Sequence, residues 1–369
     1  MTNFAWQACP SLPKLPFAVA TATSIAILIG ASDAHAQVAP PRLTPETTDN
    51  NVQFSATAAQ LDLSSSFLQR LTRQATYGFA MRANSGGGGA SESTADPLYR
   101  VWGESYGLTS RTDAQGTFVG DRRKTFGGVG GIGATIAPGL NIGFSVDQSR
   151  TDIDVPLAIQ SATLDMTQLG INAAYNNGPW TLAIAAVHGF AQVDSSRATV
   201  LGAATANYGG KVDGVLGELN YTYSLGQSRI VPKVALEYVS AATDSYREFG
   251  GFHPATVSDA NGERARVLVG AEVGHYWIFG QQAVDVSAYG KFVDNFSQNI
   301  GAVQVGLSSL PSAHTISVQG IQESMYGADA GASMSYILSN TARLYANYDG
   351  KFRDGFTSHQ GTLGVELKW

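Results

Sequence analysis

Apolar and polar residues alternate along much of the chain after residue 99. The alternation is clearest in residues 140–147, 233–238, 284–292 and 343–349. A period of two places successive side chains on opposite faces of a β-strand. One face of each predicted strand is therefore apolar, and the other carries charge, glycine and hydroxyl groups. Glu237, Asp285, Lys291 and Arg343 belong to the polar faces.

Breaks in the alternation divide this region into strands. Five compact turns lie at residues 137–139, 176–179, 225–228, 279–282 and 339–341. Six longer polar connections lie near residues 111–124, 150–161, 194–208, 240–262, 294–319 and 350–357. Short and long connections alternate, which predicts twelve antiparallel strands.

Two all-β architectures fit alternating strands. In a soluble sandwich the apolar face is the core, whereas in an outer-membrane barrel the apolar face meets lipid and the polar face lines the lumen. A strand with its connection takes roughly 23 residues here, more than the 8 to 12 of a small sandwich. Tight turns at one end and long loops at the other are typical of a transmembrane barrel.

A helix is predicted before the strands, from Phe54 to about Ala80, with Ser55 as its N-cap. Its length would be about 38 Å. We assign five residues to this lumenal helix. Leu61, Leu68 and Leu71 lie on its apolar face, and Arg70 and Arg73 lie on its polar face. The polar face suits a hydrated lumen better than lipid. A glycine and serine hinge, residues 84–94, separates the helix from the first strand.

The first 36 residues have the pattern of a secretory signal peptide. Lys14 precedes an uncharged run, which ends at Ala34-His35-Ala36. This order predicts cleavage before Gln37. The predicted organisation is therefore a signal peptide (1–36), a short linker (37–53), a helix with its hinge (54–97) and a strand region (98–369).

Composition narrows the function classes. Charged residues are 14% of the 369 residues and the mean hydropathy is -0.04, so repeated apolar membrane helices are excluded. The net charge of -6 gives no basic face for nucleic acid. The G-x-G-x-x-G run at residues 128–133 lies inside a predicted strand, which argues against a dinucleotide site. No catalytic, cofactor or metal site is predicted, and the chain is not expected to be an enzyme.

Basic residues cluster at two predicted borders between loop and strand. They are Arg122, Arg123, Lys124, Arg264 and Arg266. Their side chains could donate hydrogen bonds to lipopolysaccharide phosphates.

The last strand places Leu363, Val365, Leu367 and Trp369 on one face. A terminal aromatic residue on such a strand resembles the assembly signal of bacterial outer-membrane barrels, carried here by Gly364, Leu367 and Trp369. Leu363 stands where that pattern usually has a polar residue.

Together, residues 54–369 resemble the C-terminal translocator domain of autotransporters, the type V secretion family. The matching features are the helix, the opening strand at 99–107, the glycine-rich strand at 125–135, the strand from Leu140 and the terminal Trp369. The resemblance implies a twelve-stranded antiparallel transmembrane β-barrel in the bacterial outer membrane, with one N-terminal helix in its lumen. It also implies a monomeric barrel, contact with outer-membrane lipid and lipopolysaccharide, and dependence on the general secretion and barrel-assembly machinery.

One departure affects the functional prediction. Autotransporters usually carry a large passenger before the helix, whereas only residues 37–53 separate the predicted cleavage site from the helix here. We therefore expect a structural or display role with little passenger. A porin-like solute channel and a soluble β-rich adhesin are the alternatives.

Overall fold

The computed structural model describes residues 51–80, 98–280, 282–300, 303–307, 315–318, 320–321, 324–339 and 341–369. The predicted signal peptide with Ala34, Ala36 and Gln37 lies outside the described residues. So do linker residues 37–50 and the hinge at 84–94. Among the described residues, no helix is long and apolar enough to cross a bilayer.

Helix α1 runs from Asn51 to Ala80, so it begins three residues before the predicted start. Ser55 lies inside the helix and is not its N-cap, which corrects that prediction. A side chain from elsewhere in the chain satisfies a backbone N–H of the helix start instead, and a second contact holds the Asn51 side chain. The Val52 N–H donates to Gln160 Oε1 (3.0 Å), and Asn51 Oδ1 accepts from the Val119 N–H (3.0 Å).

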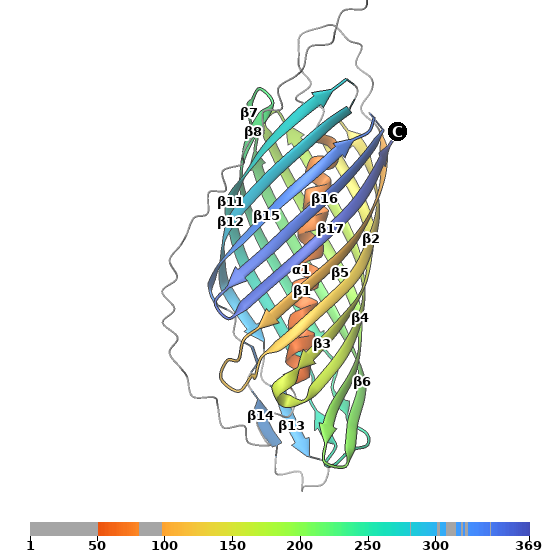
Figure 1. Cartoon of the computed structure of the whole chain (residues 1–369), viewed down its shortest axis with the longest axis vertical. Helices are drawn as coiled ribbons and strands as arrows, with labels where there is room; N and C mark the ends of the chain where they lie inside the picture. The colour runs from red at the N-terminus through yellow and green to blue at the C-terminus, as the bar shows by residue number, and fades with distance from the viewer. Residues whose placement is uncertain are drawn as a thin grey trace, which may run out of the picture. The chain divides into compact units, whose positions relative to one another are not determined.

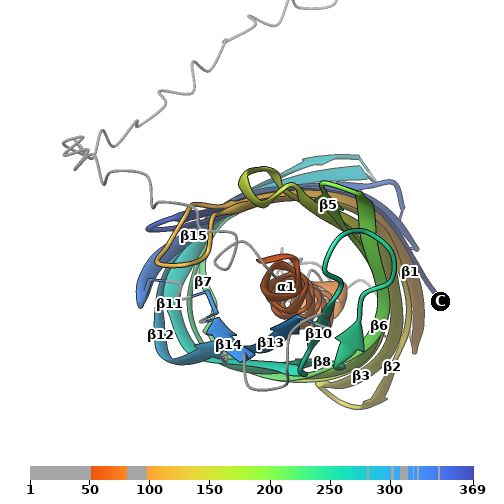
Figure 2. The same cartoon turned by 90° about the horizontal axis from the view of Figure 1, so that it is seen from below.

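Twelve antiparallel barrel strands follow, as predicted, and the pairing of β8 with β11 closes the sheet (Figures 1 and 2). The strands are β1 (Tyr99–Thr112), β2 (Asp121–Ala137), β3 (Leu140–Val155), β4 (Gln160–Asn177), β5 (Trp180–Thr199), β6 (Gly202–Tyr221) continued by β7 (Tyr223–Leu225), β8 (Ser228–Thr243), β11 (Ala260–Phe279), β12 (Gln282–Ile300), β15 (Tyr326–Ile337), β16 (Ala342–Arg353) and β17 (Phe356–Lys368).

Shorter elements lie within three of the connections. A 3-10 turn, η2, covers Pro156–Ala158 between β3 and β4. A small antiparallel sheet has the order β14-β13-β10-β9. Its strands are β9 (Tyr246–Arg247), β10 (Ala255–Val257), β13 (Val303–Leu307) and β14 (Thr315–Val318).

The two ends of the barrel differ less than the sequence predicts. We call the end with the five predicted compact turns the turn end, and the opposite end the loop end. Three of the six connections predicted to be long are short: β3 and β4 are joined by residues 156–159, β5 and β6 by 200–201, and β16 and β17 by 354–355. The prediction failed because few of the outward side chains are apolar there, as with Arg150, Asp152 and Asp154 of β3. Polar strand ends were therefore mistaken for loops.

The side chains of the barrel face as a membrane barrel requires. On β3, Phe144 is 44% exposed, while the carboxylate of Asp147 on the lumen face is fully buried. Other outward side chains are also large and apolar, among them Ile142, Val234, Leu236 and Phe292. An apolar exterior with a polar interior is the inverse of a soluble core and is typical of a transmembrane barrel.

The outward apolar face yields a direct test. Leu236 is 60% exposed in the middle of β8. Replacing it by arginine puts a charge against lipid, and we expect Leu236→Arg to lower the free energy of unfolding by about 2 to 4 kcal/mol. Urea titration of the protein in phospholipid vesicles measures this. The control, Ser161→Arg, lies at the loop end of β4 on the same outer surface. An equal loss of unfolding free energy in both variants would contradict the assignment of Leu236 to the lipid-facing surface.

Candidate functional site

Helix α1 occupies the lumen (Figure 2). Its backbone lies nearest to β3, β4, β5, β6, β8 and β11. The side chains of Leu61, Leu68, Leu71 and Arg70 are buried, and Arg73 is half-buried. Apolar and polar faces are both enclosed because the wall surrounds the helix. The polar face therefore meets charged wall residues rather than bulk water.

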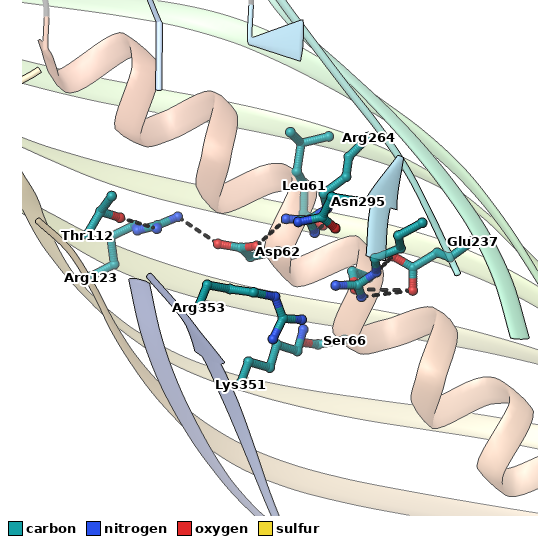
Figure 3. Close-up of polar contacts among 12 residues, drawn as sticks. Leu61, Asp62, Ser66, Thr112, Arg123, Glu237, Arg264, Asn295, Lys351 and Arg353 are labelled. Carbon is teal, nitrogen blue, oxygen red and sulfur yellow. Dashed lines mark hydrogen bonds and ion pairs between the residues drawn. The ribbon is translucent and has the colours of Figure 1, made fainter. Parts of the chain in front are cut away.

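Asp62 is the only carboxylate on α1, and it lies between two arginines of the wall (Figure 3). Arg123 Nη1 on β2 donates to Asp62 Oδ2 (3.0 Å), and Arg264 Nη1 on β11 donates to Asp62 Oδ1 (3.1 Å). All three side chains are buried. We call this group the Asp62 clamp.

The clamp corrects part of the lipopolysaccharide prediction. Arg123, Arg264 and Arg266 lie on inward registers, so they point into the lumen and not toward lipid. Arg266 binds Glu237 (Nε to Oε1, 2.8 Å) and also donates to Ser65 of α1. These basic residues do lie near the loop ends of their strands, as predicted. Neighbouring residues of a strand, however, face opposite sides of the barrel wall. Arg122 and Lys124 are exposed on the outer surface.

Toward the turn end, α1 carries the opposite charge. Arg70 Nη2 donates to Asp147 Oδ2 on β3 (3.1 Å), and Tyr106 of β1 also donates to that carboxylate (2.9 Å). Arg73 makes two hydrogen bonds to Asp349 on β16, at 2.5 and 3.2 Å. An axial shift of one helical turn would move every charge about 5.4 Å and break these pairs.

The two ends of α1 are also fixed. At the loop end, Gln53 Nε2 donates to Thr243 Oγ1 (3.2 Å). At the turn end, Gln74 Nε2 donates to Glu104 Oε1 (2.7 Å), and Arg100 Nη1 donates to the Gln74 carbonyl (2.6 Å). The helix therefore extends along the lumen with its N-terminus at the loop end.

Glycines of β4 and β6 make room for the helix, and the sequence alone did not identify these two positions. A Cβ on Gly170 would lie 2.6 Å from Leu71 Cδ1, and one on Gly214 would lie 2.9 Å from Leu68 Cδ1. Such distances are too short for carbon atoms, so a larger residue would force the Leu71 or Leu68 side chain to move. The glycines of β2 differ, since Gly127 and Gly131 receive the Tyr106 and Trp102 side chains of β1.

The other predicted lumen charges also have partners. Asp285 pairs with Arg229, Lys291 with Glu218 (3.3 Å) and Arg343 with Glu366 (2.6 Å). Together with Glu237, all four predicted residues therefore lie in ion pairs of the lumen wall. Among the described residues, no group of three or more His, Cys, Asp or Glu could hold a metal ion.

The end of the chain lies beside β1. Backbone hydrogen bonds join Trp369 and Tyr99 in both directions (3.1 Å each), and the side chains of Leu367 and Trp369 are exposed on the outer surface. A Cβ on Gly364 would lie 2.3 Å from the Tyr345 ring, so glycine is required there. The role of these three residues as an assembly signal stays a prediction.

Comparisons with known proteins agree with this architecture. The family model described as the autotransporter β-domain matches residues 101–349. The chain belongs to the autotransporter β-domain family. It is therefore an outer-membrane translocator barrel of protein secretion, and not a soluble adhesin.

Solved autotransporter structures share the fold. The translocator domain of NalP from Neisseria meningitidis is similar at 14% identity and a TM-score of 0.66, over 85% of this chain and 98% of that chain. The β-domain of the Bordetella autotransporter BrkA is similar at 15% identity and a TM-score of 0.53, over 74% of this chain and 100% of that one. No curated protein matches the sequence.

The Asp62 clamp of this autotransporter β-domain can be tested by removing its carboxylate. Asp62→Ala removes the carboxylate that the two buried guanidinium groups share, and breaking a buried ion pair typically costs about 3 to 5 kcal/mol. We expect amide hydrogen exchange in α1 to accelerate while exchange in the strands is unchanged.

The matched control for this variant is Asp113→Ala. Asp113 pairs with Arg111 at 3.0 Å, but the two side chains are 56% and 63% exposed, so the pair contributes about 0 to 1 kcal/mol. Exchange in α1 that is the same in Asp62→Ala as in the unmodified protein would show that the clamp does not hold the helix.

Proposed function

We propose that this translocator barrel keeps α1 as a permanent plug and presents the segment preceding α1 at the cell surface. The observation that carries the proposal is the direction of the helix. Asn51 and Val52 are held at the loop end by Val119 and Gln160, whereas Gln74 is held at the turn end by Glu104. The loop end of such barrels faces outward, so the chain before Asn51 would begin on the outer side.

The proposed role of the presented segment is display or envelope integrity. Residues 37–50 lie between the predicted cleavage site and α1, and they include three prolines and few apolar residues. A segment of this size and composition cannot bury a core of its own. The presented part of this chain would therefore act as a peptide and not as a folded catalytic or adhesive domain.

A solute channel is less well supported. Its lumen charges would have to be available to a passing solute. The wall residues Asp285, Lys291 and Arg343 are instead paired with other charges, and α1 occupies the lumen. The arrangement favours a plugged translocator over an open pore.

Protease shaving of intact cells tests the presentation. We expect an epitope inserted after Pro40 to be lost on protease treatment of whole cells, as is an epitope in the β1–β2 connection at Gln115. An epitope at Gly226, in a turn-end connection, should survive until the outer membrane is permeabilised. Protection of the Pro40 epitope in intact cells, with loss of the Gln115 epitope, would contradict the proposal.

A further inference from the structure

Strands β17, β1 and β2 lie side by side in the wall of the barrel (Figure 1). A shallow groove lies on their outer surface. The groove measures about 580 Å³. Its sides and floor are formed by the outward residues Gly103, Ser105, Gly128, Gly130, Leu363 and Val365 and by the backbone of Glu104, Val129 and Gly364. Because the outward face of a translocator barrel meets lipid, the groove opens into the membrane.

The groove has an apolar lining and ample room. Leu363 and Val365 form one side, and Phe126, 72% exposed on β2, lies next to Gly128 on the same outward face, toward the loop end. A Cβ on Gly130 would have no atom within 4 Å, and one on Gly103 would meet only a carbonyl at 3.8 Å. The space is therefore empty of protein side chains. Its natural occupant in a bilayer is a narrow apolar chain.

Basic side chains lie at the loop end of the same two strands. Arg111 of β1 pairs in register with Arg122 of β2, and Lys124 follows on the outward face of β2. Lys124 is four residues from Gly128, about 13 Å along the strand. Among the described residues, neither Arg122 nor Lys124 has an ion-pair partner within 4.0 Å.

On the β3 side of β2, carboxylates lie opposite both basic residues. Asp154 and Asp152 of β3 are in register with Arg122 and Lys124. On the other side, Arg111 lies opposite Arg122, and its own partner is the exposed Asp113. An anionic group would therefore approach Arg122 and Lys124 from above β1, directly in line with the groove.

We propose that this surface binds lipopolysaccharide, with one acyl chain in the groove and a headgroup phosphate on Arg122 and Lys124. The order along the strands matches such a lipid, because the charges lie at the loop end and the groove lies toward the membrane interior. An outer-leaflet lipid places its phosphates at that end, whereas an inner-leaflet phospholipid would place them at the turn end. Guanidinium and ammonium groups both donate charge-assisted hydrogen bonds to phosphate oxygens.

The test uses the full mature chain, refolded from urea into detergent micelles and therefore free of lipopolysaccharide. Purified lipopolysaccharide or phosphatidylglycerol is then added at matched concentrations. We expect lipopolysaccharide to raise the midpoint temperature of the unfolding band shift on gels, because a ligand of the folded state stabilises it. Phosphatidylglycerol should raise it less. Native mass spectrometry gives the number bound and the affinity.

Two sets of variants separate the headgroup from the groove. Arg122→Ser with Lys124→Ser should weaken binding of lipopolysaccharide about tenfold. Gly103→Val with Gly130→Val fills the groove and should remove the temperature shift. The control is Gly217→Val, an outward position of β6 where a Cβ also has no atom within 4 Å, and it should bind as the unmodified protein does.

Three results would overturn the proposal. One is unchanged lipopolysaccharide binding in the groove-filled variant. The second is equal binding of lipopolysaccharide and phosphatidylglycerol with equal loss in the Ser variants, which would identify a general anionic-lipid surface. The third is dimerisation in detergent that the groove-filled variant abolishes, which would identify the groove as a contact between two copies.

Discussion

The structure depends on pairing the charged side chains that are buried between α1 and the barrel wall. Asp62 lies between Arg123 and Arg264, from β2 and β11, while Arg70 and Arg73 reach Asp147 and Asp349 on other strands. An unpaired charge in such a place is costly. The wall therefore fixes the rotation and the height of α1, and the helix in turn neutralises wall residues that would otherwise repel one another.

Packing and polarity act together in this arrangement. Gly170 and Gly214 bring the wall close enough for Leu71 and Leu68 to make contact, and this closeness allows the ion pairs to form at hydrogen-bond distance. The outer surface obeys the opposite requirement, because lipid accepts only apolar side chains in the middle of the strands. Because side chains alternate along a strand, the same strand supplies polar residues to the lumen and apolar residues to the lipid. Asp147 points inward, and its neighbour Val146 points outward.

The alternation of residues predicted the strands and which side chains share a face, because both are set by local periodicity. The spacing of the breaks predicted twelve strands and a membrane barrel, and a spacing of three and four residues predicted the helix. The start of α1 could not be predicted from Ser55, because the Val52 N–H is satisfied by Gln160 and the Asn51 side chain accepts from Val119, and both partners are distant in sequence. The partners of Asp62 were missed for a related reason. The position of a residue at a border between loop and strand does not tell which side of the wall its side chain faces. Arg122 and Arg123 are neighbours, but they point to opposite sides of the wall. The strand ends near residues 194–208 likewise have few apolar residues on the outward face, and their apolar residues, such as Ala204 and Tyr208, point into the lumen.

The central claim is that α1 fills the lumen of the folded barrel. Single-channel recording in planar bilayers tests it most directly, with the mature chain, a chain lacking residues 51–80, and a control lacking only residues 37–50. The account predicts little conductance for the mature chain and for the control, and a large, steady conductance once α1 is removed. An equally large conductance in all three proteins would contradict it.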